Sequence, residues 1–384
     1  MPSLLRGAVA VLGATAGLTF AAPAVASADD TVGHVYVNDN TTGTNTISGY
    51  DRHADGSLTP IPGSPFVAGG AGTGSGGLAS QGAIQVASDG RYVLAVDAGS
   101  NQISVLRIRR DGSLELVRGG PVPSNGSEPV SVAEHAGLVY VANAGRTSSS
   151  YTGFALGRNG QLEPLADSTF PLPPRAQPGD VLFNSDGRNL VGTRVGATPA
   201  ASAIDSFRVD RDGRLDPAPG SPFPAQGPGP FGSEFRPTDP DQLFVSNAHG
   251  GPGAGTVSAF DVPRDGTLFS IGGSPFADGQ TAPCWVEITE DGRYLFTVNT
   301  GSGSISSYRI DGSGRLHLLA STLVSGGKGA GAVDARLSTE GQTLYVNETK
   351  VGQIGEFAVD GGDLTELGSV PVSTGAGAAG VAVN

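Results

Sequence analysis

The chain repeats one unit of roughly 50 residues, and residues 283–316 show this unit clearly. Three short runs rich in Val, Ile, Phe, Tyr and Thr, at 285–288, 294–298 and 305–310, are separated by Glu-Asp-Gly-Arg and Asn-Thr-Gly-Ser-Gly, and a fourth run begins at Leu316. Such residues favour strands, and Gly and Asp favour the tight turns between them, so the unit predicts an antiparallel four-stranded meander. One such sheet cannot bury both of its faces, so the copies must pack on one another.

Two independent markers each count seven copies of the unit. The first is an aromatic residue or Leu followed three positions later by a polar residue, at Tyr36/Asp39, Leu94/Asp97, Tyr140/Asn143, Leu190/Thr193, Phe244/Asn247, Phe296/Asn299 and Tyr345/Glu348. The second is an Asp-Gly-like turn, at Gly56, Gly112, Gly160, Gly213, Gly266, Gly314 and Gly362. This period with four strands is typical of a propeller blade, so we expect an all-β, seven-bladed β-propeller with four-stranded antiparallel blades.

The two ends of the repeat predict how the ring closes. The first copy begins at its second strand, residues 34–39, whereas the chain finishes on residues 380–384, which match the innermost strand of the other copies. The C-terminal strand should therefore join the N-terminal blade, making residues 29–384 a single propeller domain. A Pro-Gly-Ser-Pro-Phe tail, as at 62–66, recurs at the outer edge of blades, where we expect it to be structural, with its Phe between blades.

Residues 1–28 have the pattern of a secretory signal peptide. Arg6 precedes a mostly apolar run from 7 to 22, and Ala26-Ser27-Ala28 offers the small residues that signal peptidase prefers. No other apolar run is long enough to cross a bilayer. The sequence therefore predicts an exported protein that is secreted or extracellular and is not inserted in a membrane.

The charge balance bears on the partners that the protein can have. Of 23 Lys and Arg only Arg6 lies in the leader, so the remaining chain has 22 basic and 36 acidic residues, a net charge of −14. Nucleic acid and anionic membranes would be repelled, so we expect neither as a partner, and we expect a monomer. Cys284 is the only cysteine, which excludes an internal disulfide, and we expect its thiol to be buried and inert.

The first candidate site is the face on which each second strand ends. In a meander the innermost strand begins on that same face, so the seven polar residues of the first marker should form a circle there, although Asn and Asp also cap tight turns. Long loops rise from this face in the fourth and fifth blades. His249, Arg146, Arg194 and Lys350 lie in its loops and could bind an anionic ligand.

The second candidate site is the axial channel. Aligned innermost strands place Asp180, Trp285 and Asp334 in one register, and Glu234, Glu287 and Arg336 two residues further along. Positions two apart share one side of a strand, and the intervening positions are mostly apolar, so the polar side should line the channel. These groups could form a solvated pore with paired charges, a site of catalysis or substrate binding, or a cation site.

The repeats YVANAG and GRYLFTVNTGSGSISSYRI, with tails such as PGSPF, resemble those of the lactonase-type seven-bladed propellers, a family that includes a phosphogluconolactonase and a carboxy-muconate lactonising enzyme. The resemblance covers residues 31–384. It implies hydrolysis or closure of a small lactone that carries a carboxylate or phosphate. It also implies that no cofactor or metal is needed, and that His, Arg and acidic residues on the channel face do the chemistry.

Two functions follow as hypotheses. In the first, the protein is a secreted lactone hydrolase in which Glu234 or Glu287 activates water and Arg336, Arg194 or His249 steadies the oxyanion and the substrate's charge. Its substrate would also be bound by Asp180, Trp285, Asp334 and Arg146. In the second, the protein is not an enzyme and binds a carbohydrate, peptide or protein partner through its loop face.

Overall fold

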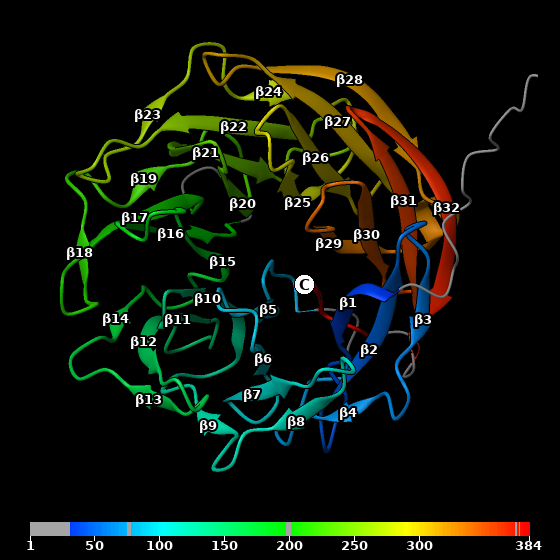
Figure 1. The fold of residues 1–384 in the computed structure, drawn as a ribbon. Helices are drawn as coiled ribbons and strands as arrows, with labels where there is room; N and C mark the ends of the chain where they lie inside the picture. The colour runs from blue at the N-terminus through cyan, green and yellow to red at the C-terminus, as the bar shows by residue number, and fades with distance from the viewer. Residues whose placement is uncertain (1–30, 75–77, 197–200, 373–374, 376) are drawn as a thin grey trace, which may run out of the picture.

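The computed structural model describes residues 31–74, 78–196, 201–372, 375 and 377–384. The predicted signal peptide, 1–28, lies outside these residues. The described chain forms seven sheets arranged like spokes around a central axis (Figure 1). Within the described part, η1 (Gly327–Gly329) is the only helical element. No helix among the described residues is long and apolar enough to cross a membrane.

The first four blades are five-stranded sheets. Blade one contains β1 (Thr31–Asn38), β2 (Thr46–His53), β3 (Leu58–Pro60), β4 (Phe66–Val67) and β33 (Gly380–Val383). Blade two contains β5 (Ile84–Val86), β6 (Tyr92–Asp97), β7 (Gln102–Ile108), β8 (Leu114–Leu116) and β9 (Val122–Pro123). Blade three contains β10 (Pro129–His135), β11 (Leu138–Asn143), β12 (Ser150–Leu156), β13 (Leu162–Pro164) and β14 (Phe170–Pro171). Blade four contains β15 (Pro178–Phe183), β16 (Asn189–Arg194), β17 (Ala203–Val209), β18 (Leu215–Pro217) and β19 (Phe223–Pro224).

The remaining three blades complete the circle. Blade five contains β20 (Pro230–Arg236), β21 (Asp239–Asn247), β22 (Thr256–Asp261), β23 (Phe269–Ser270) and β24 (Phe276–Ala277). Blade six contains β25 (Pro283–Ile288), β26 (Tyr294–Asn299), β27 (Ser304–Ile310) and β28 (Leu316–Leu323). Blade seven contains β29 (Ala332–Leu337), β30 (Thr343–Glu348), β31 (Gln353–Asp360) and β32 (Asp363–Pro371).

The ring closes as the sequence predicts. In blade one the strand order is β3-β2-β1-β33, and Val37 lies opposite Val381 in the antiparallel register. The innermost strands contact one another in the order β5, β10, β15, β20, β25, β29 and β33, and β33 contacts β5 again. The seven-bladed all-β fold is therefore confirmed.

The blade edge differs from the expected four strands. In five blades the chain after the outer hairpin returns and adds a two-residue strand to the third strand of the sheet. The Pro-Gly-Ser-Pro-Phe tail makes this strand in blade one, where Phe66 lies opposite Ile47. Phe66 packs against a hydrophobic cluster that contains Ile47 of blade one and Ile84 and Val93 of blade two. The tail is therefore structural, with its Phe between blades, but it forms an additional strand.

The two sequence markers meet where neighbouring blades pack. The Tyr36 hydroxyl donates to the carbonyl of Gly112 in the hairpin of the next blade at 2.8 Å, and Tyr140 donates to Gly213 in the same way. Both tyrosines are fully buried, and both glycines have positive φ, which a tight hairpin requires. Tyr345 donates to Gly56 in the same way, so in the three copies whose marker residue is Tyr the two markers form one inter-blade contact.

Candidate active site

A pocket lies on the face where the innermost strands begin and the second strands end. Its volume is about 610 Å³, and its walls come from the innermost strands of blades three to five, from the loops that follow their second strands, and from the segment before blade two. Its lining residues are Leu78, Ala79, Glu128, Val130, Ala144, Arg146, Arg175, Gln177, Pro178, Val195, Phe231 and His249. Two arginines, a carboxylate and a histidine therefore share one partly apolar cavity.

The backbone before each innermost strand sets the rim of this pocket. Glu128 and Gln177 precede the first Pro of β10 and β15, and they have φ of 56° and 48°, in the left-handed region. Ala282 has the same conformation before β25, with φ of 55°, so the turn belongs to the scaffold. The side chains at these turns differ between blades, and in blades three and four the turn supplies exposed Glu128 and Gln177 to the pocket.

His249 lies in the loop after β21 and is exposed in the pocket. Its Nδ1 is 3.2 Å from the carbonyl oxygen of Gly196. A carbonyl oxygen can only accept, so in this contact Nδ1 carries the hydrogen and, in the neutral ring, Nε2 carries the lone pair. The imidazole is thus oriented by a neighbouring loop, with Nε2 available to take a proton.

Arg146 and Arg175 are both exposed in the same pocket. Arg146 lies in the loop between β11 and β12 of blade three, and Arg175 lies in the connection from β14 of blade three to β15 of blade four. The amide of Arg175 donates to the carbonyl of Arg146 at 3.2 Å, which joins these loops. Sequence reasoning placed Arg146 and His249 on this face but missed Arg175 and Glu128. Both lie in connections before innermost strands, where the strand pattern carries no signal for a pocket.

Ser80 and Gln81, which precede β5, form a plug across the axial channel. The Gln81 amide donates to the carbonyl of Ser233 in blade five, and its Oε1 accepts from the amide of Val286 in blade six at 3.1 Å. The Gln81 backbone amide donates to Gly179 in blade four, and the Ser80 hydroxyl donates to Val130 in blade three. Both plug residues are 1% exposed. The plug therefore ties four innermost strands together at the end of the channel that faces the pocket.

Trp285 and Asp180 belong to this plugged layer. The Trp285 indole donates to the carbonyl of Ser80 at 3.0 Å, and its side chain packs against Phe231. Asp180 accepts from the backbone amide and hydroxyl of Ser233, and burial raises the pKa of Asp180 to about 7 although those hydrogen bonds oppose the rise. The structure therefore places both residues in the enclosed scaffold beneath the pocket.

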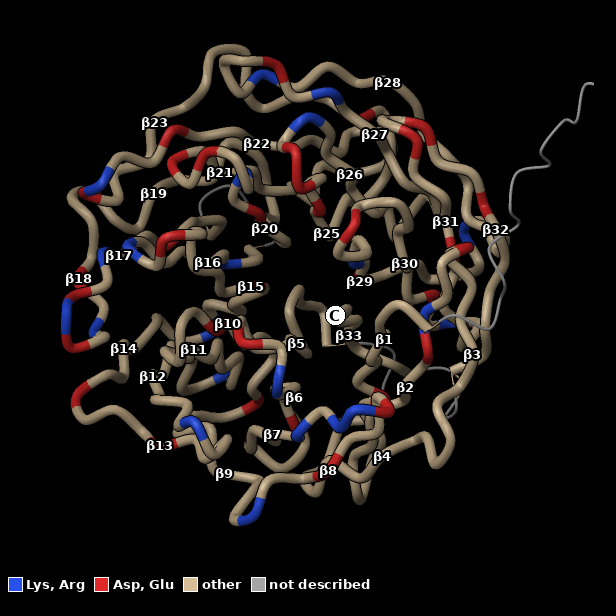
Figure 2. The backbone as a smooth tube through the Cα atoms, viewed as in Figure 1, with Lys and Arg blue, Asp and Glu red and all other residues tan. Residues whose placement is uncertain are grey.

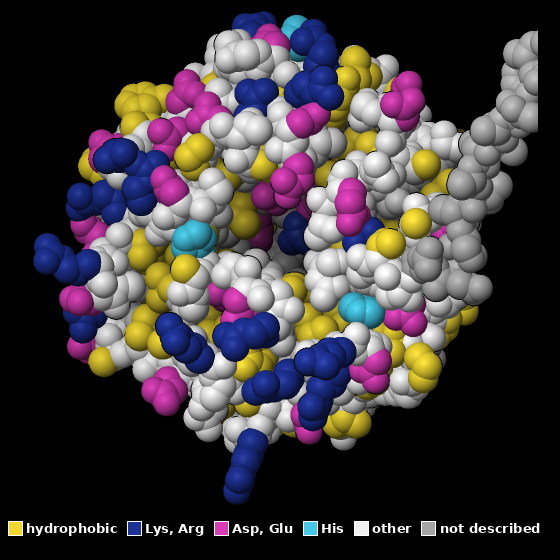
Figure 3. All heavy atoms as spheres, viewed as in Figure 1, with side chains coloured by type: hydrophobic (Ala, Val, Ile, Leu, Met, Phe, Trp, Pro, Cys, Tyr) yellow, Lys and Arg dark blue, Asp and Glu magenta, His cyan; other side chains and the backbone are white. Residues whose placement is uncertain are grey.

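Glu234, Glu287 and Arg336 do meet in the channel, as their shared register predicts. The Arg336 guanidinium pairs with Glu287 and lies 3.8 Å from Glu234, and Glu287 also accepts from the backbone amide of Leu337. Figure 3 shows acidic and basic side chains together around the central hollow of the viewed face. These side chains are 10% to 24% exposed, so water reaches them only in part.

Burial and charge pairing distinguish the two channel glutamates. Burial raises the pKa of Glu234 well above its ordinary value, and the Glu287 charge adds to the rise. Burial also raises the pKa of Glu287, whereas Arg336 opposes that rise. The cluster has one guanidinium for two carboxyl groups, so we infer that one of the carboxyls is protonated. The protonated group is Glu234, which is farther from Arg336. The arrangement is a self-paired charge cluster.

Asp334 and Arg194 also have internal partners. Asp334 is fully buried and accepts from the backbone amides of Ala335 and Val381, and burial raises its pKa to about 7. Arg194 pairs with the buried Asp205, which also accepts from the Tyr151 hydroxyl at 3.1 Å. The structure thus places His249 and Arg146 together in the pocket. Arg194 is instead paired within the sheet of blade four.

The circle of polar residues at the ends of the second strands proves to be buried. In five blades each member bonds to a hydroxyl of the third strand, in the pairs Asp39–Ser48, Asp97–Ser104, Asn143–Thr152, Asn247–Ser258 and Asn299–Ser306. Their role is therefore to join strands.

Cys284 is also buried, and burial raises the pKa of its thiol to about 12. In the described part of the chain, no three His, Cys, Asp or Glu side chains are grouped to hold a metal ion.

The fold and the pocket define a seven-bladed propeller with a cationic cavity at one end of a plugged channel. The family described as lactonase, 7-bladed beta-propeller, matches residues 34–183 and 190–380. The chain belongs to this family. The resemblance seen in the repeats is thereby confirmed.

Solved structures show the same fold at low sequence identity. A candidate 6-phosphogluconolactonase from Bacteroides uniformis superposes with a TM-score of 0.73 at 18% identity, covering 92% of this chain and 100% of the other. A candidate 6-phosphogluconolactonase from Bacteroides fragilis gives 0.73 at 20% identity, covering 93% and 99%. The periplasmic gluconolactonase of Pseudomonas aeruginosa gives 0.67 at 19% identity, covering 90% and 98%. A comparison with curated proteins found no match.

Proposed function

We propose that the protein hydrolyses a small anionic lactone in the pocket that holds His249, Arg146 and Arg175. The carrying observation is the hydrogen bond from His249 Nδ1 to Gly196, because it fixes the tautomer whose Nε2 can accept a proton from water. The family and the gluconolactonase fold neighbours support the choice of a cyclic ester as substrate.

The proposed reaction uses the pocket's own groups. Nε2 of His249 takes a proton from water, the resulting hydroxide oxygen attacks the lactone carbonyl, and the ring C–O bond breaks as the tetrahedral intermediate collapses. The proton on His249 then passes to the departing ring oxygen, which yields an open-chain hydroxy acid. Arg146 and Arg175 supply positive charge for the oxyanion and for a carboxylate or phosphate of the substrate.

This proposal moves the chemistry from the channel to the pocket above the plug. The enclosed Gln81 and Ser80 lie between the pocket and the channel cluster, and the channel arginine is already paired with Glu287. By contrast, His249, Arg146 and Arg175 are exposed. A lactone bound in the pocket can reach these three side chains directly.

The test is hydrolysis of a panel of aldonolactones with and without a phosphate or carboxylate. We expect His249→Ala to lower kcat by about 10²–10⁴-fold, the usual contribution of a general base. His317→Ala, a change at an exposed histidine in the outer strand of blade six, should leave kcat unchanged. Arg146→Ala and Arg175→Ala should raise KM for charged lactones more than for neutral ones.

A channel variant separates this mechanism from the alternative one. Glu234→Gln removes a channel carboxyl and should leave kcat near its original value if the pocket is the site. A large loss in folded Glu234→Gln together with an active His249→Ala would overturn the assignment. Absence of turnover on every lactone would favour the other hypothesis, a propeller that binds a carbohydrate, peptide or protein partner through its loop face.

We further propose that the protein is exported, on the basis of the leader-like residues 1–28. Expression of the whole chain followed by fractionation and N-terminal sequencing tests this. A mature N-terminus at Asp29 outside the cytoplasm is the expected result, and an intact leader on a cytoplasmic protein would contradict it.

A further inference from the structure

Arginines gather where blades two and three meet, on the face opposite the pocket. The hairpins at this seam join first to second strands and third to fourth strands, whereas the pocket lies where innermost strands begin. We call the set the arginine seam, and its members are Arg91, Arg107, Arg109, Arg118 and Arg158. All are exposed. Figure 2 marks Lys and Arg positions along the backbone around β7–β9, and Figure 3 shows basic side chains concentrated over the same region. This concentration stands out in a chain with a net charge of −13.

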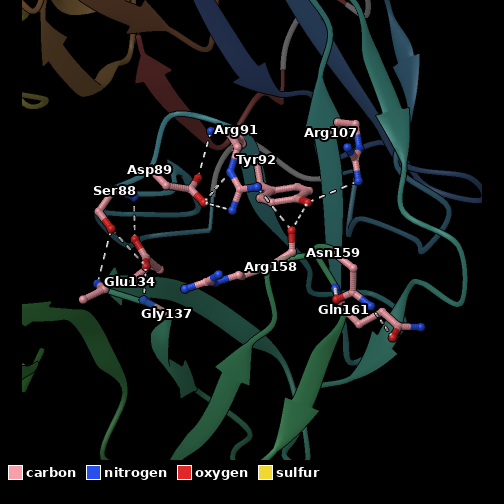
Figure 4. Close-up of polar contacts among 11 residues, drawn as sticks. Ser88, Asp89, Arg91, Tyr92, Arg107, Glu134, Gly137, Arg158, Asn159 and Gln161 are labelled. Atoms are coloured by element: carbon pink, nitrogen blue, oxygen red, sulfur yellow. Dashed lines mark hydrogen bonds and ion pairs between the residues drawn. The ribbon is translucent and has the colours of Figure 1, made fainter.

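Tyr92 orders one end of the seam (Figure 4). The guanidinium carbons of Arg91 and Arg107 each lie 5.4 Å from the centre of its ring. The Tyr92 hydroxyl donates to the carbonyl of Arg158 at 2.9 Å and accepts from Arg107 at 3.2 Å. Cations that stack on a ring are held in position, so part of the ordering cost of ligand binding is already met.

The acidic residues nearby neutralise only part of this charge. Asp89 pairs with Arg91 at 2.6 Å, and Glu115 pairs with Arg109. Within the described residues, the guanidinium groups of Arg118 and Arg158 have no hydrogen-bond or ion-pair partner. Their donors therefore point into solvent at a surface that can accept anionic groups.

A groove in the seam has the chemistry of a sugar site. It has a volume of about 480 Å³ and combines three arginines with two carboxamides and two apolar side chains: Arg107, Arg109, Arg118, Asn159, Gln161, Leu116 and Val117. Glu115 also lines it, paired with Arg109. Carboxamides can bond sugar hydroxyls, apolar side chains can pack on ring faces, and planar guanidinium groups match carboxylates.

We propose that the arginine seam binds a segment of an acidic polysaccharide, a chain of uronic acid residues. The groove supplies hydroxyl-binding and carboxylate-binding groups side by side. Beyond it, Arg91 and Arg158 line a second groove that also holds Asp89 and Glu134, so the positive charge of the seam is concentrated in the first groove. Nucleic acid fits less well, since the groove lining holds no aromatic side chain and Tyr92 is only 1% exposed, so no ring is offered for base stacking. The proposal is independent of the lactonase proposal, because no residue is shared.

The experiment is calorimetric titration of the protein with oligogalacturonate of about ten residues at low salt. A malto-oligosaccharide of equal length supplies the hydroxyls without the charge, and inorganic polyphosphate supplies charge without the sugar. We expect binding of the uronate that weakens with added salt, and no binding of the neutral oligomer. Polyphosphate binding as tight as uronate binding would show recognition of charge alone and would overturn the proposal.

Matched variants locate the binding. Arg118→Ala combined with Arg158→Ala should weaken uronate binding at least tenfold, while the backbone carbonyl of Arg158 that Tyr92 uses remains. Arg264→Ala combined with Arg309→Ala removes the same charge from exposed positions on blades five and six and should change affinity less than twofold. Equal effects of the two pairs, or no effect of the first in a folded protein, would overturn the assignment. Gln161→Ala, which removes a carboxamide from the groove, should weaken binding of the uronate more than binding of polyphosphate.

Discussion

The Arg194 and Asp205 side chains are 13% and 2% exposed, whereas Arg208 and Asp216, a pair on the same sheet, are more than half exposed. The same two residue types therefore have different roles. An enclosed pair depends on both partners, because either charge alone would be buried without compensation. This contrast explains why Arg194, which was predicted to bind substrate from a loop, instead stabilises the sheet of blade four.

We predict that Arg194→Ala destabilises the protein far more than Arg208→Ala does. Loss of Arg194 leaves Asp205 buried and unpaired, which costs about 3–5 kcal/mol, whereas an exposed pair contributes about 0–1 kcal/mol. Urea unfolding of both variants measures the difference. Equal losses would mean that Asp205 is not enclosed as described.

Asp180 carries a prediction about pH. Burial raises its folded-state pKa to about 7, above the ordinary 3.8, so the folded state holds this proton more tightly than the unfolded state does. Stability from this group is fully present below pH 3.8 and falls by about 1.4 kcal/mol per pH unit up to pH 7. Asp180→Asn should therefore make unfolding free energy less dependent on pH between 4 and 7, and an unchanged slope would contradict the raised pKa. Asp334, with the same pKa, should keep part of the slope in the variant.

At the scale of elements, the strands were predictable and the plug was not. The markers at Tyr36 and Gly112 report local strand and turn chemistry, so two independent patterns located the blades. Gln81 has no counterpart in the repeat, and its partners are more than 90 residues away in sequence. Part of the pocket was missed for the same reason, since Arg175 and Arg146 meet only because the loop after β11 contacts the connection from blade three to blade four.

The plug predicts a selective glycine requirement. An added Cβ at Gly232 would lie 2.1 Å from Gln81 Oε1 and 2.6 Å from the carbonyl oxygen of Cys284, whereas one at Gly312 would meet nothing within 4 Å. Gly232→Ala should destabilise the protein by about 1–3 kcal/mol, the usual cost of overpacking, and Gly312→Ala should be nearly neutral. Thermal unfolding of the two variants compares them directly. A neutral Gly232→Ala would show that the plug does not press against blade five.

The whole molecule depends on one strand that is remote in sequence. β33 pairs with β1 and packs between β29 and β5, so it completes blade one and supplies the last contact of the ring. The sequence predicted this arrangement because residues 380–384 match the inner strands and the first copy lacks one. Without β33, the inner edge of β1 and the neighbouring blade faces would be exposed to water.

We predict that a chain of residues 31–379 loses cooperative unfolding and aggregates. A circular permutant, which keeps β33 but begins and ends elsewhere in the ring, tests whether ring closure is sufficient for stability. Asn384 lies beside His34, so a short linker can join 384 to 31, with new ends opened between Arg211 and Asp212 in an exposed hairpin. The permutant should unfold within about 5 °C of the chain 31–384. A stable truncated chain would show that the ring does not need β33.

The split of blade one also sets an order of events during synthesis. Six blades are contiguous in the chain and can fold while the ribosome is still translating, but blade one waits for residues 380–383. Until then β1 offers an open edge to chaperones or, in an exported chain, to the translocation machinery. Ring closure therefore reports that translation has passed residue 383, and products of premature termination would be left as open, protease-sensitive arcs.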